Sequence, residues 1–441
     1  MGKGKGNKNV WMGVGVSTLA DSYNAAKEAA ERALKKLIKK PVLSFVFYAG
    51  NYDPYKISNS LKKSLVDTEF VGGSAPSIFY DEKLFHQGVI VISFYSEFLR
   101  AGVASSDSVT KNPFSISKKT TLEALEKIHL DKYIDPYIQF SRIKKGDIRG
   151  IIRVPSFMLF VFTRGFKLKN VGREVDIING VTEVVGQYVP IFGGSLGVPL
   201  DKVFNNEDYE IYTLHSGKVM KDGMVVVMVN SGLIYTNTIA HGCEPTDSMG
   251  FVTGVELGGY VVSSISNKSP IKWYSEALGI NEKEFLKNIM VYTQQHAIAM
   301  PDGEGGYVMR AGGIPYKNDK MSFVAPFKLG TPVVLMKCTN PNILKASQEL
   351  KNDIKLHLGG KNLKPIVVIG TMCASREVIL KEETKKELKM LKDTLNLGEI
   401  PFVGFYSFGE IGSKIGQACK FNHMTANLFL LYDKLITDLP K

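Results

Sequence analysis

The side chains with the most chemical versatility gather near the C-terminal end of the sequence. Two strands are predicted there, at 365–370 and 426–432, with a glycine-rich segment at 404–412 between them. Strand ends are where α/β proteins present side chains to ligands, because the backbone leaves the sheet there. The candidate ligand-binding residues are Cys373, Arg376, Tyr406, Glu410, Asn422 and His423.

These residue types allow binding, catalysis or a purely structural role. For binding, Arg376 would hold a carboxylate through two parallel hydrogen bonds, and Glu410 would hold an amine. For catalysis, Cys373 would be a nucleophile whose pKa the neighbouring Arg376 lowers, and His423 would be the base. For structure, Glu410 and Arg376 would form a buried salt bridge. The residue pattern leaves all three interpretations open.

Three other motifs favour structural turns over chemistry. The glycine motif at 13–15 lies between a predicted strand and a predicted helix, but residue 18 is Thr where a dinucleotide-binding motif needs glycine. The G-x-S-x-G pattern at 193–197 is followed by Pro199 and an irregular stretch, where a nucleophile elbow needs a helix. The H-x-C pattern at 241–243 lacks further zinc ligands. We therefore assign no metal, cofactor or catalytic residue.

Predicted strands alternate with predicted helices along most of the chain, which is typical of an α/β fold. The same strand–helix order recurs, so we predict internal repeats at 10–104 and 151–247, joined by a connector at 105–150, and a looser third copy at 331–432. The strand that closes each unit is predicted to be antiparallel. We therefore expect mixed sheets flanked by helices, in a two-part architecture.

Length and composition exclude several classes of protein. The 441 residues are 44% hydrophobic and 22% charged, which is ordinary for a globular protein of two or three domains. Four cysteines are too few for a disulfide scaffold, so we expect a chain that needs no disulfide, in the reducing cytoplasm. No apolar run approaches the ~18 residues of a membrane span. We expect no membrane association and no signal peptide.

The net charge of +12 raises nucleic acid as a partner. The excess is concentrated at the start of the chain, in a basic tail at 1–9 that we expect to be disordered and in a predicted helix at 21–39. A nucleic-acid- or ribosome-associated protein is therefore an alternative. Its binding would depend on four lysines of the basic region, Lys35, Lys36, Lys39 and Lys40.

Several motifs together resemble the FIST family over residues 10–432. The most specific is Gly404-Phe-Tyr-Ser-Phe-Gly-Glu-Ile-Gly412, which is similar to the family's G-F-Y-x-x-G-E-I-G string. The segment Phe421-Asn422-His423-Met-Thr425 departs from the usual F-H-N-x-T, because His and Asn are exchanged. The other matching segments are Gly13–Ser17, Gly193-Gly194, Asp222-Gly223, Tyr307–Arg310, Gly330–Val333 and the Cys373-x-x-Arg376 pair.

The resemblance implies a sensory protein of signal transduction that binds a small molecule, such as an amino acid or a related metabolite. It also implies a FIST N-terminal domain at 10–250 and a FIST C-terminal domain at 251–441. We expect binding rather than catalysis, in a stand-alone protein that acts through an unidentified protein partner. The alternative from another class is a cysteine-dependent enzyme acting on a small metabolite, with Cys373 as nucleophile and His423 as base.

Overall fold

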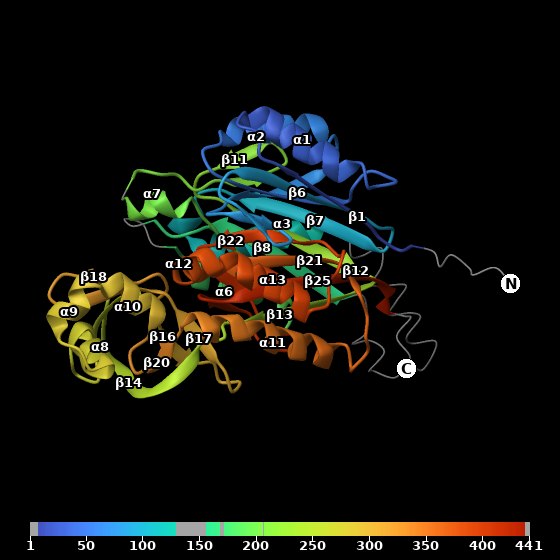
Figure 1. Ribbon diagram of the computed structural model, residues 1–441. Helices are drawn as coiled ribbons and strands as arrows, with labels where there is room; N and C mark the ends of the chain where they lie inside the picture. The colour runs from blue at the N-terminus through green and yellow to red at the C-terminus, as the bar shows by residue number, and fades with distance from the viewer. Residues whose placement is uncertain (1–7, 129–155, 168–171, 206, 437–441) are drawn as a thin grey trace.

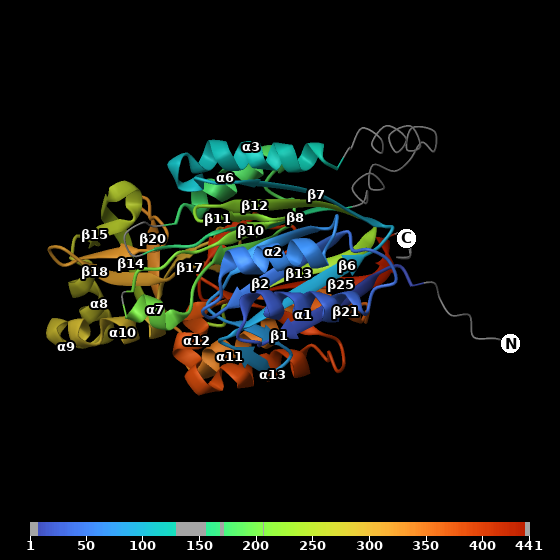
Figure 2. The ribbon, with the colours of Figure 1, turned by 90° about the horizontal axis from the view of Figure 1, so that it is seen from above.

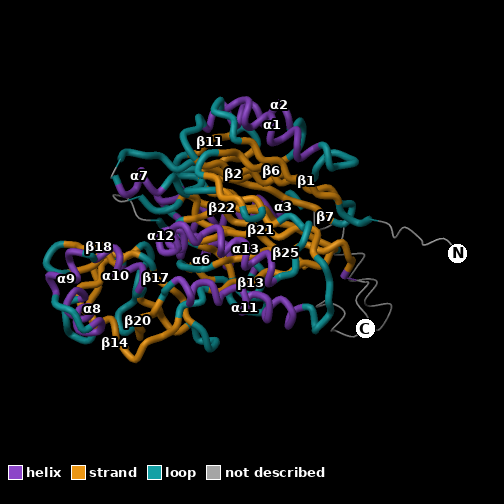
Figure 3. The backbone as a smooth tube through the Cα atoms, in the orientation of Figure 1, coloured by secondary structure: helices purple, strands orange, loops and turns teal. Residues whose placement is uncertain are grey.

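The computed structural model describes residues 8–128, 156–167, 172–205 and 207–436. Helices cover the outer faces of several stacked sheets, as the purple and orange segments of Figure 3 show. Three sheets of six strands form the core, and a fourth, seven-stranded sheet lies at one end of the molecule (Figure 1). Within these described residues, no helix has both the length and the apolar character to cross a membrane.

The first unit of the core contains four principal strands and two helices. Strand order is β1-β6-β2-β3, with β2 and β3 parallel and β6 antiparallel to both of its neighbours. The elements are β1 (Trp11–Ser17), α1 (Ser22–Leu34), β2 (Leu43–Ala49), α2 (Pro54–Ser64), β3 (Glu69–Ser74) and β6 (Gly88–Tyr95).

The glycines at 13 and 15 are explained by packing between β1 and α1. A Cβ atom on Gly13 would lie 1.8 Å from the carbonyl oxygen of Ala33, and one on Gly15 would lie 1.9 Å from that of Ala29. Alanines on α1 and glycines on β1 therefore allow a close approach that larger side chains would prevent. Asp21 caps the helix by accepting a hydrogen bond from the backbone N–H of Asn24 at 2.9 Å.

The second and third units repeat this strand order. In the second, β7-β12-β8-β9 takes the place of β1-β6-β2-β3, and in the third β13-β25-β21-β22 does. The second unit comprises β7 (Leu99–Ser106), η1 (Val109–Lys111), α3 (Pro113–Glu126), β8 (Ser156–Arg164), α6 (Glu174–Val185), β9 (Ile191–Leu196), α7 (Leu200–Phe204) and β12 (Met224–Ser231). The third comprises β13 (Leu233–Ala240), α11 (Asn340–His357), β21 (Pro365–Cys373), α12 (Ala374–Leu380), η3 (Lys381–Glu383), α13 (Thr384–Thr394), β22 (Phe402–Ser407) and β25 (Ala426–Leu435).

Each unit also gives a hairpin to the sheet of another unit. The hairpin of unit one, β4 (Ile78–Tyr80) and β5 (Lys83–Phe85), extends the sheet of unit three at β22. That of unit two, β10 (Thr213–His215) and β11 (Lys218–Met220), extends unit one at β3. That of unit three, β23 (Glu410–Gly412) and β24 (Lys420–Asn422), extends unit two at β9. The three units are thereby interlocked in a cycle.

Aromatic side chains from all three units meet in the centre of the core. Phe47 of unit one stacks on Phe405 of unit three, with ring centroids 3.9 Å apart. Phe160 of unit two lies 4.8 Å from Phe45 of unit one and 5.1 Å from Phe429 of unit three. These rings belong to one buried apolar cluster that spans the three sheets, so the core cannot be divided into independently packed halves.

Residues 244–337, here called the inserted lobe, interrupt the third unit between β13 and α11 (Figure 1). Its sheet order is β17-β16-β20-β14-β15-β19-β18. The lobe comprises β14 (Glu244–Glu256), η2 (Leu257–Gly259), β15 (Val261–Ile265), α8 (Pro270–Leu278), α9 (Glu282–Lys287), α10 (Ile289–Gln295), β16 (Ile298–Pro301), β17 (Tyr307–Arg310), β18 (Gly312–Tyr316), β19 (Lys320–Phe323) and β20 (Pro332–Lys337).

A disulfide between Cys243 and Cys338 joins the two chain segments at the base of the inserted lobe. We expected a chain that needs no disulfide, so this bond differs from the expectation. The two cysteines are 95 residues apart in the sequence, and their spacing gave no sign of the pairing. Cys243 is therefore not available as a thiolate, which removes one of the two residues of the H-x-C pattern as a metal ligand.

The predicted fold class is confirmed, with mixed sheets, flanking helices and a two-part layout. Two predicted boundaries fall elsewhere in the structure. The connector predicted at 105–150 contains α3, which belongs to the second unit, and its residues 129–150 lie outside the described residues. The division predicted between residues 250 and 251 falls inside β14. Residues 1–7 of the predicted tail also lie outside the described part of the chain.

Candidate functional site

A cavity of about 570 Å³ lies where the inserted lobe meets the core. Helices α10 of the lobe and α7 and α12 of the core lie next to one another around it (Figures 1 and 2). The lobe contributes Met290, Val291, Gln294, Gln295, Ala311, Gly312, Ile314 and Val324 to the lining. The core contributes Phe166, Leu200, Val203, Phe204, Cys373, Ala374, Ser375, Val378, Ile379, Lys381, Ser407, Phe408 and His423. The wall is therefore mostly apolar, with a few polar groups.

Two of the six candidate residues, Cys373 and His423, line this cavity. Cys373 ends β21 and lies beside Ser407, the last residue of the parallel strand β22, so both side chains reach the same cavity edge. His423 comes from the turn between β24 and β25. The remaining four, Arg376, Tyr406, Glu410 and Asn422, are buried and are absent from the cavity wall.

The surroundings of Cys373 oppose formation of a thiolate. The side chain is buried, and burial raises the pKa of the thiol well above its ordinary value. The nearby carboxyl group of Glu410 raises this pKa further. Arg376, which we expected to lower it, has its guanidinium engaged elsewhere. The site thus lacks the electropositive, partly exposed setting of a reactive cysteine.

His423 is 1% exposed and is held as a neutral imidazole. Its Nδ1 lies 3.4 Å from the carbonyl oxygen of Met309, and because a carbonyl only accepts, Nδ1 carries the proton. Burial lowers the pKa of His423 to about 3, with a further contribution from the positive charge of Arg310. Nε2 is consequently an acceptor, and no group in the described part of the chain hydrogen-bonds to it.

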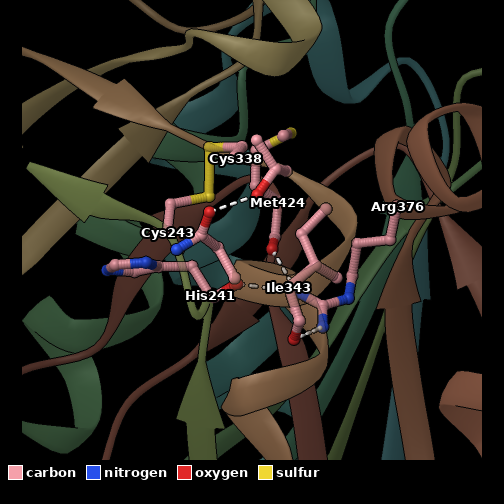
Figure 4. The surroundings of a disulfide bond; sticks show 8 residues. His241, Cys243, Cys338, Ile343, Arg376 and Met424 are labelled. Atoms are coloured by element: carbon pink, nitrogen blue, oxygen red, sulfur yellow. Dashed lines mark hydrogen bonds between the residues drawn. A yellow bond between two sulfur atoms is a disulfide. The ribbon is translucent and has the colours of Figure 1, made fainter.

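Arg376 is the centre of a buried group of polar contacts, which we call the Arg376 cluster. Its Nε donates to Oε1 of Glu387 at 2.8 Å, and Nη2 donates to the same oxygen. Three backbone carbonyls accept its other hydrogen bonds, those of His241 at 3.0 Å, Ile343 at 3.1 Å and Met424 at 2.7 Å (Figure 4). The salt bridge with Glu410, one of the three interpretations left open by the sequence, is not formed, because Glu387 takes that place.

Glu410 forms a second buried polar group, without a cation. Its Oε1 accepts a hydrogen bond from the Ser407 hydroxyl at 2.7 Å, and its Oε2 accepts one from the Thr425 hydroxyl at 2.7 Å. Burial raises the pKa of Glu410 to about 8, although these hydrogen bonds oppose the rise. The carboxyl group is therefore mostly protonated at neutral pH. A neutral carboxylic acid that is already hydrogen-bonded is not placed to hold an amine.

The side chains of Asn422 and Tyr406 also make their contacts inside the protein. The Asn422 amide donates to the backbone carbonyls of Lys420, at 3.0 Å, and Gly412, at 3.3 Å, and so closes the β23–β24 hairpin. Tyr406 packs against Phe79 within the apolar cluster, and its pKa is raised by burial. The serine of the G-x-S-x-G pattern, Ser195, donates to Glu174 at 2.6 Å in a fully buried pair.

Sequence reasoning missed the lobe side of the cavity and the partner of Arg376. Glu387 had a usable signal, because it occupies the same face of α13 as Leu391, one turn further along. A carboxylate within an apolar helical stripe indicates a buried ion pair. The lobe residues Met290, Val291 and Gln294 had no comparable signal, because their role depends on where the lobe docks.

The fold and the cavity define an α/β protein that encloses a space of the size that small molecules occupy. The chain belongs to the FIST family, since residues 42–268 match the FIST N domain and residues 270–413 match the FIST C domain. FIST domains are known as sensory domains that bind small ligands in signal transduction. The family predicted from the motifs is thereby confirmed.

Solved structures resemble this chain only distantly. A cyanuric acid hydrolase from A. caulinodans is 9% identical, with a TM-score of 0.36, over 96% of this chain and 99% of that one. A phosphoribosylformylglycinamidine synthase II from Thermotoga maritima is 9% identical, with a TM-score of 0.21, over 84% of this chain and 76% of that one. No curated protein matches the sequence significantly.

Proposed function

We propose that this protein is a sensor that binds its small ligand in the cavity between the inserted lobe and the core. The observation that carries the proposal is the cavity itself, of about 570 Å³, with a largely apolar wall drawn from two parts of the fold. Pockets of this size and character are typical of small-molecule sites. A ligand there would contact α10 of the lobe and α12 of the core at once, and could therefore change how the two parts sit together.

An amino acid or a related metabolite is the ligand that the sequence suggested. The ion pairs expected for it are not supported by the contacts of Arg376 and Glu410, which have partners inside the protein. Among the predicted site residues, Cys373 and His423 remain in the proposed site. We propose that the output partner is another protein.

A cytoplasmic location stays a prediction and rests on the small number of cysteines. Disulfides are rare in the reducing cytosol. The Cys243–Cys338 bond, whose cysteines are 6% and 0% exposed, therefore gives this prediction a direct test. Thiol counting on protein rapidly alkylated in cell extracts would show four free thiols in a reducing compartment and two where the bond persists.

A bulky substitution in the cavity wall tests whether the ligand binds in the cavity. Val378 on α12 lines the cavity, and Val378→Trp would occupy space that a ligand needs. The matched control is Val66→Trp, at a valine that is 60% exposed and far from the lining in the sequence. A thermal-shift screen of amino acids and apolar metabolites would be run on all three proteins. A ligand at ~100 times its Kd adds about 2.7 kcal/mol, or roughly 3 °C for a chain of this size.

We expect at least one compound that shifts the wild type and the Val66→Trp control, and that leaves Val378→Trp unshifted. A compound that shifts all three proteins equally would place the ligand outside the cavity. An unchanged melting temperature across the whole panel would contradict the sensor proposal.

A further inference from the structure

We infer that the ligand is an uncharged, largely apolar molecule that donates a hydrogen bond to Nε2 of His423. This inference rests on the proposed function and specifies the class of its ligand. It follows from three observations on the cavity wall: the scarcity of charge, the extent of apolar surface and one buried acceptor that lacks a partner.

Charge is nearly absent from the wall. Among the described lining residues, Lys381 is the one with a formal charge, and its side chain is exposed at the end of α12. Arg376, which follows the lining residue Ser375 in the sequence, is absent from the lining and pairs with Glu387 in the Arg376 cluster. A zwitterion in the cavity would therefore lose its hydration without finding a matched pair of opposite charges, which is costly.

Apolar side chains face the cavity from both of its walls. Val203 and Phe408 contribute from the core, and Met290, Ile314 and Val324 contribute from the lobe. A ligand that covers these groups removes apolar surface from water on two sides at once. The wall therefore favours a molecule whose own surface is mainly hydrocarbon or aromatic.

The polar specificity of the cavity depends on His423. Because Nδ1 donates to the Met309 carbonyl and the ring is neutral, Nε2 presents a lone pair. No described residue donates to it, and the side chain is 1% exposed. A buried acceptor without a donor is unfavourable, and a ligand N–H or O–H would relieve this. The charged group near this ring is Arg310, which lowers its pKa, and the titratable Glu410 carboxyl lies on the adjoining hairpin.

A second polar contact is available on the lobe side. The Oε1 atom of Gln294 is buried and has no hydrogen-bond partner among the described residues. A primary amide can present either its oxygen or its nitrogen after a rotation, so Gln294 accommodates a donor or an acceptor. His423 is the more selective of the two, because its tautomer is fixed.

The rim of the cavity carries apolar side chains that are exposed in the absence of a ligand. Phe204 on α7 is 57% exposed, and Val291 and Met290 on α10 are 53% and 43% exposed. They face the cavity from the core and from the lobe. A mainly apolar ligand would reduce their contact with water, whereas a charged ligand would gain nothing from them.

The experiment compares two scaffolds, each in four forms that differ in charge and in hydrogen-bond donation. The indole set is indole, 1-methylindole, L-tryptophan and indole-3-acetate. The biphenyl set is 4-hydroxybiphenyl, 4-methoxybiphenyl, 4-phenylphenylalanine and biphenyl-4-carboxylate. Binding of each probe to the full chain is measured by titration calorimetry and by ligand-observed NMR. Three variants are added, His423→Leu, His423→Gln and the control Lys385→Gln, at an exposed lysine of α13 outside the cavity lining.

We expect indole or 4-hydroxybiphenyl to bind best, and methylation of the donor to weaken binding by about tenfold or more. His423→Leu should abolish the difference between donor and methylated forms, His423→Gln should retain part of it, and Lys385→Gln should leave both affinities unchanged. The pairs of probes test the inference on the wild type alone, should His423→Leu fail to fold.

Tightest binding by a zwitterion or an anion would overturn the inference and leave the proposed function standing. Equal binding of donor and methylated forms would overturn the role of His423. Absence of binding by all eight probes, together with a blank thermal-shift screen, would overturn both. If the thermal-shift screen finds a charged ligand while all eight probes fail to bind, the inferred class of ligand is overturned. The proposed binding site in the cavity then stands.

Discussion

Two short backbone segments separate regions of opposite character. Residues 373–376 place Cys373 on the cavity and Arg376 in the cluster behind it. At 423–424 the imidazole of His423 lines the cavity, while the carbonyl of Met424 accepts a hydrogen bond from Arg376. In the Arg376 cluster, each guanidinium nitrogen of Arg376 donates to an acceptor. In the cavity wall, a buried acceptor has no donor within the described residues.

The difference shows how to sort polar residues that look equivalent in a motif. Arg376 and His423 both belong to the segments that resemble the family, and both are about 1% exposed. What separates them is hydrogen-bond saturation, since a saturated buried group stabilises the fold and an unsaturated one facing a cavity is available to a ligand. Substitutions at Arg376, Glu410 and His423 test this contrast.

Replacing Arg376 should unfold the protein more readily rather than abolish binding alone. Arg376→Ala leaves the carboxylate of Glu387 buried without its partner, so we expect a loss of about 3–5 kcal/mol in the free energy of unfolding. Denaturant titration followed by circular dichroism measures it. The control is the double variant Arg376→Met/Glu387→Met, which removes both charges and should cost clearly less. A single variant as stable as the wild type would contradict the structural role.

Glu410, between the two regions, should make stability fall as the pH rises. Its folded-state pKa, about 8, is above the ordinary value of 4.5, so between these values the native state binds more protons than the unfolded state. Stability is then lost with rising pH, by up to about 1.4 kcal/mol per unit. We expect a decline between pH 7 and pH 8, where the histidines of the unfolded state are already mostly neutral, and a flatter profile for Glu410→Gln. Equal slopes for both proteins would refute the assignment.

His423→Leu should change stability least. At pH 7 the substitution removes an unpartnered buried nitrogen and one long hydrogen bond, so we expect a change within about 1 kcal/mol of the wild type. Below pH 6.5 the unfolded state takes up a proton that the native imidazole, with a pKa of about 3, does not. The wild type therefore loses stability as the pH falls towards 5, and the variant should gain relative to it. Urea titrations at pH 5 and pH 7 make the comparison.

The repeated core was predictable because its signals are local. Alanines on α1 recur with helical spacing opposite glycines on β1, and apolar runs such as 43–49 fit buried strands. The exchange of hairpins between units was beyond prediction, since β4 pairs with β22 across more than three hundred residues of chain. Such pairing depends on sheet edges that exist only after the units have folded.

Part of the site was also predictable, because strand ends have local signals in the sequence. Strand-end positions led to Cys373 and His423 as candidate residues, and both lie in the cavity wall. The sequence could not distinguish them from Arg376, because the partner of Arg376 lies on another helix and its carbonyl acceptors come from three further segments. Nor could it place Gln294, which reaches the cavity only through the docking of the inserted lobe.

At the base of the inserted lobe, the two chain segments that connect it to the core lie close together. The Cα atoms of Cys243 and Cys338 are 4.6 Å apart, little more than the 3.8 Å between consecutive residues. The chain thus leaves the core and returns to it at nearly one point. A different lobe inserted at this point would leave the strand order of the core unaltered. The eight lining residues of the lobe would change with it, and the Arg376 cluster would remain in the core. Sensors for different molecules could therefore share a single core.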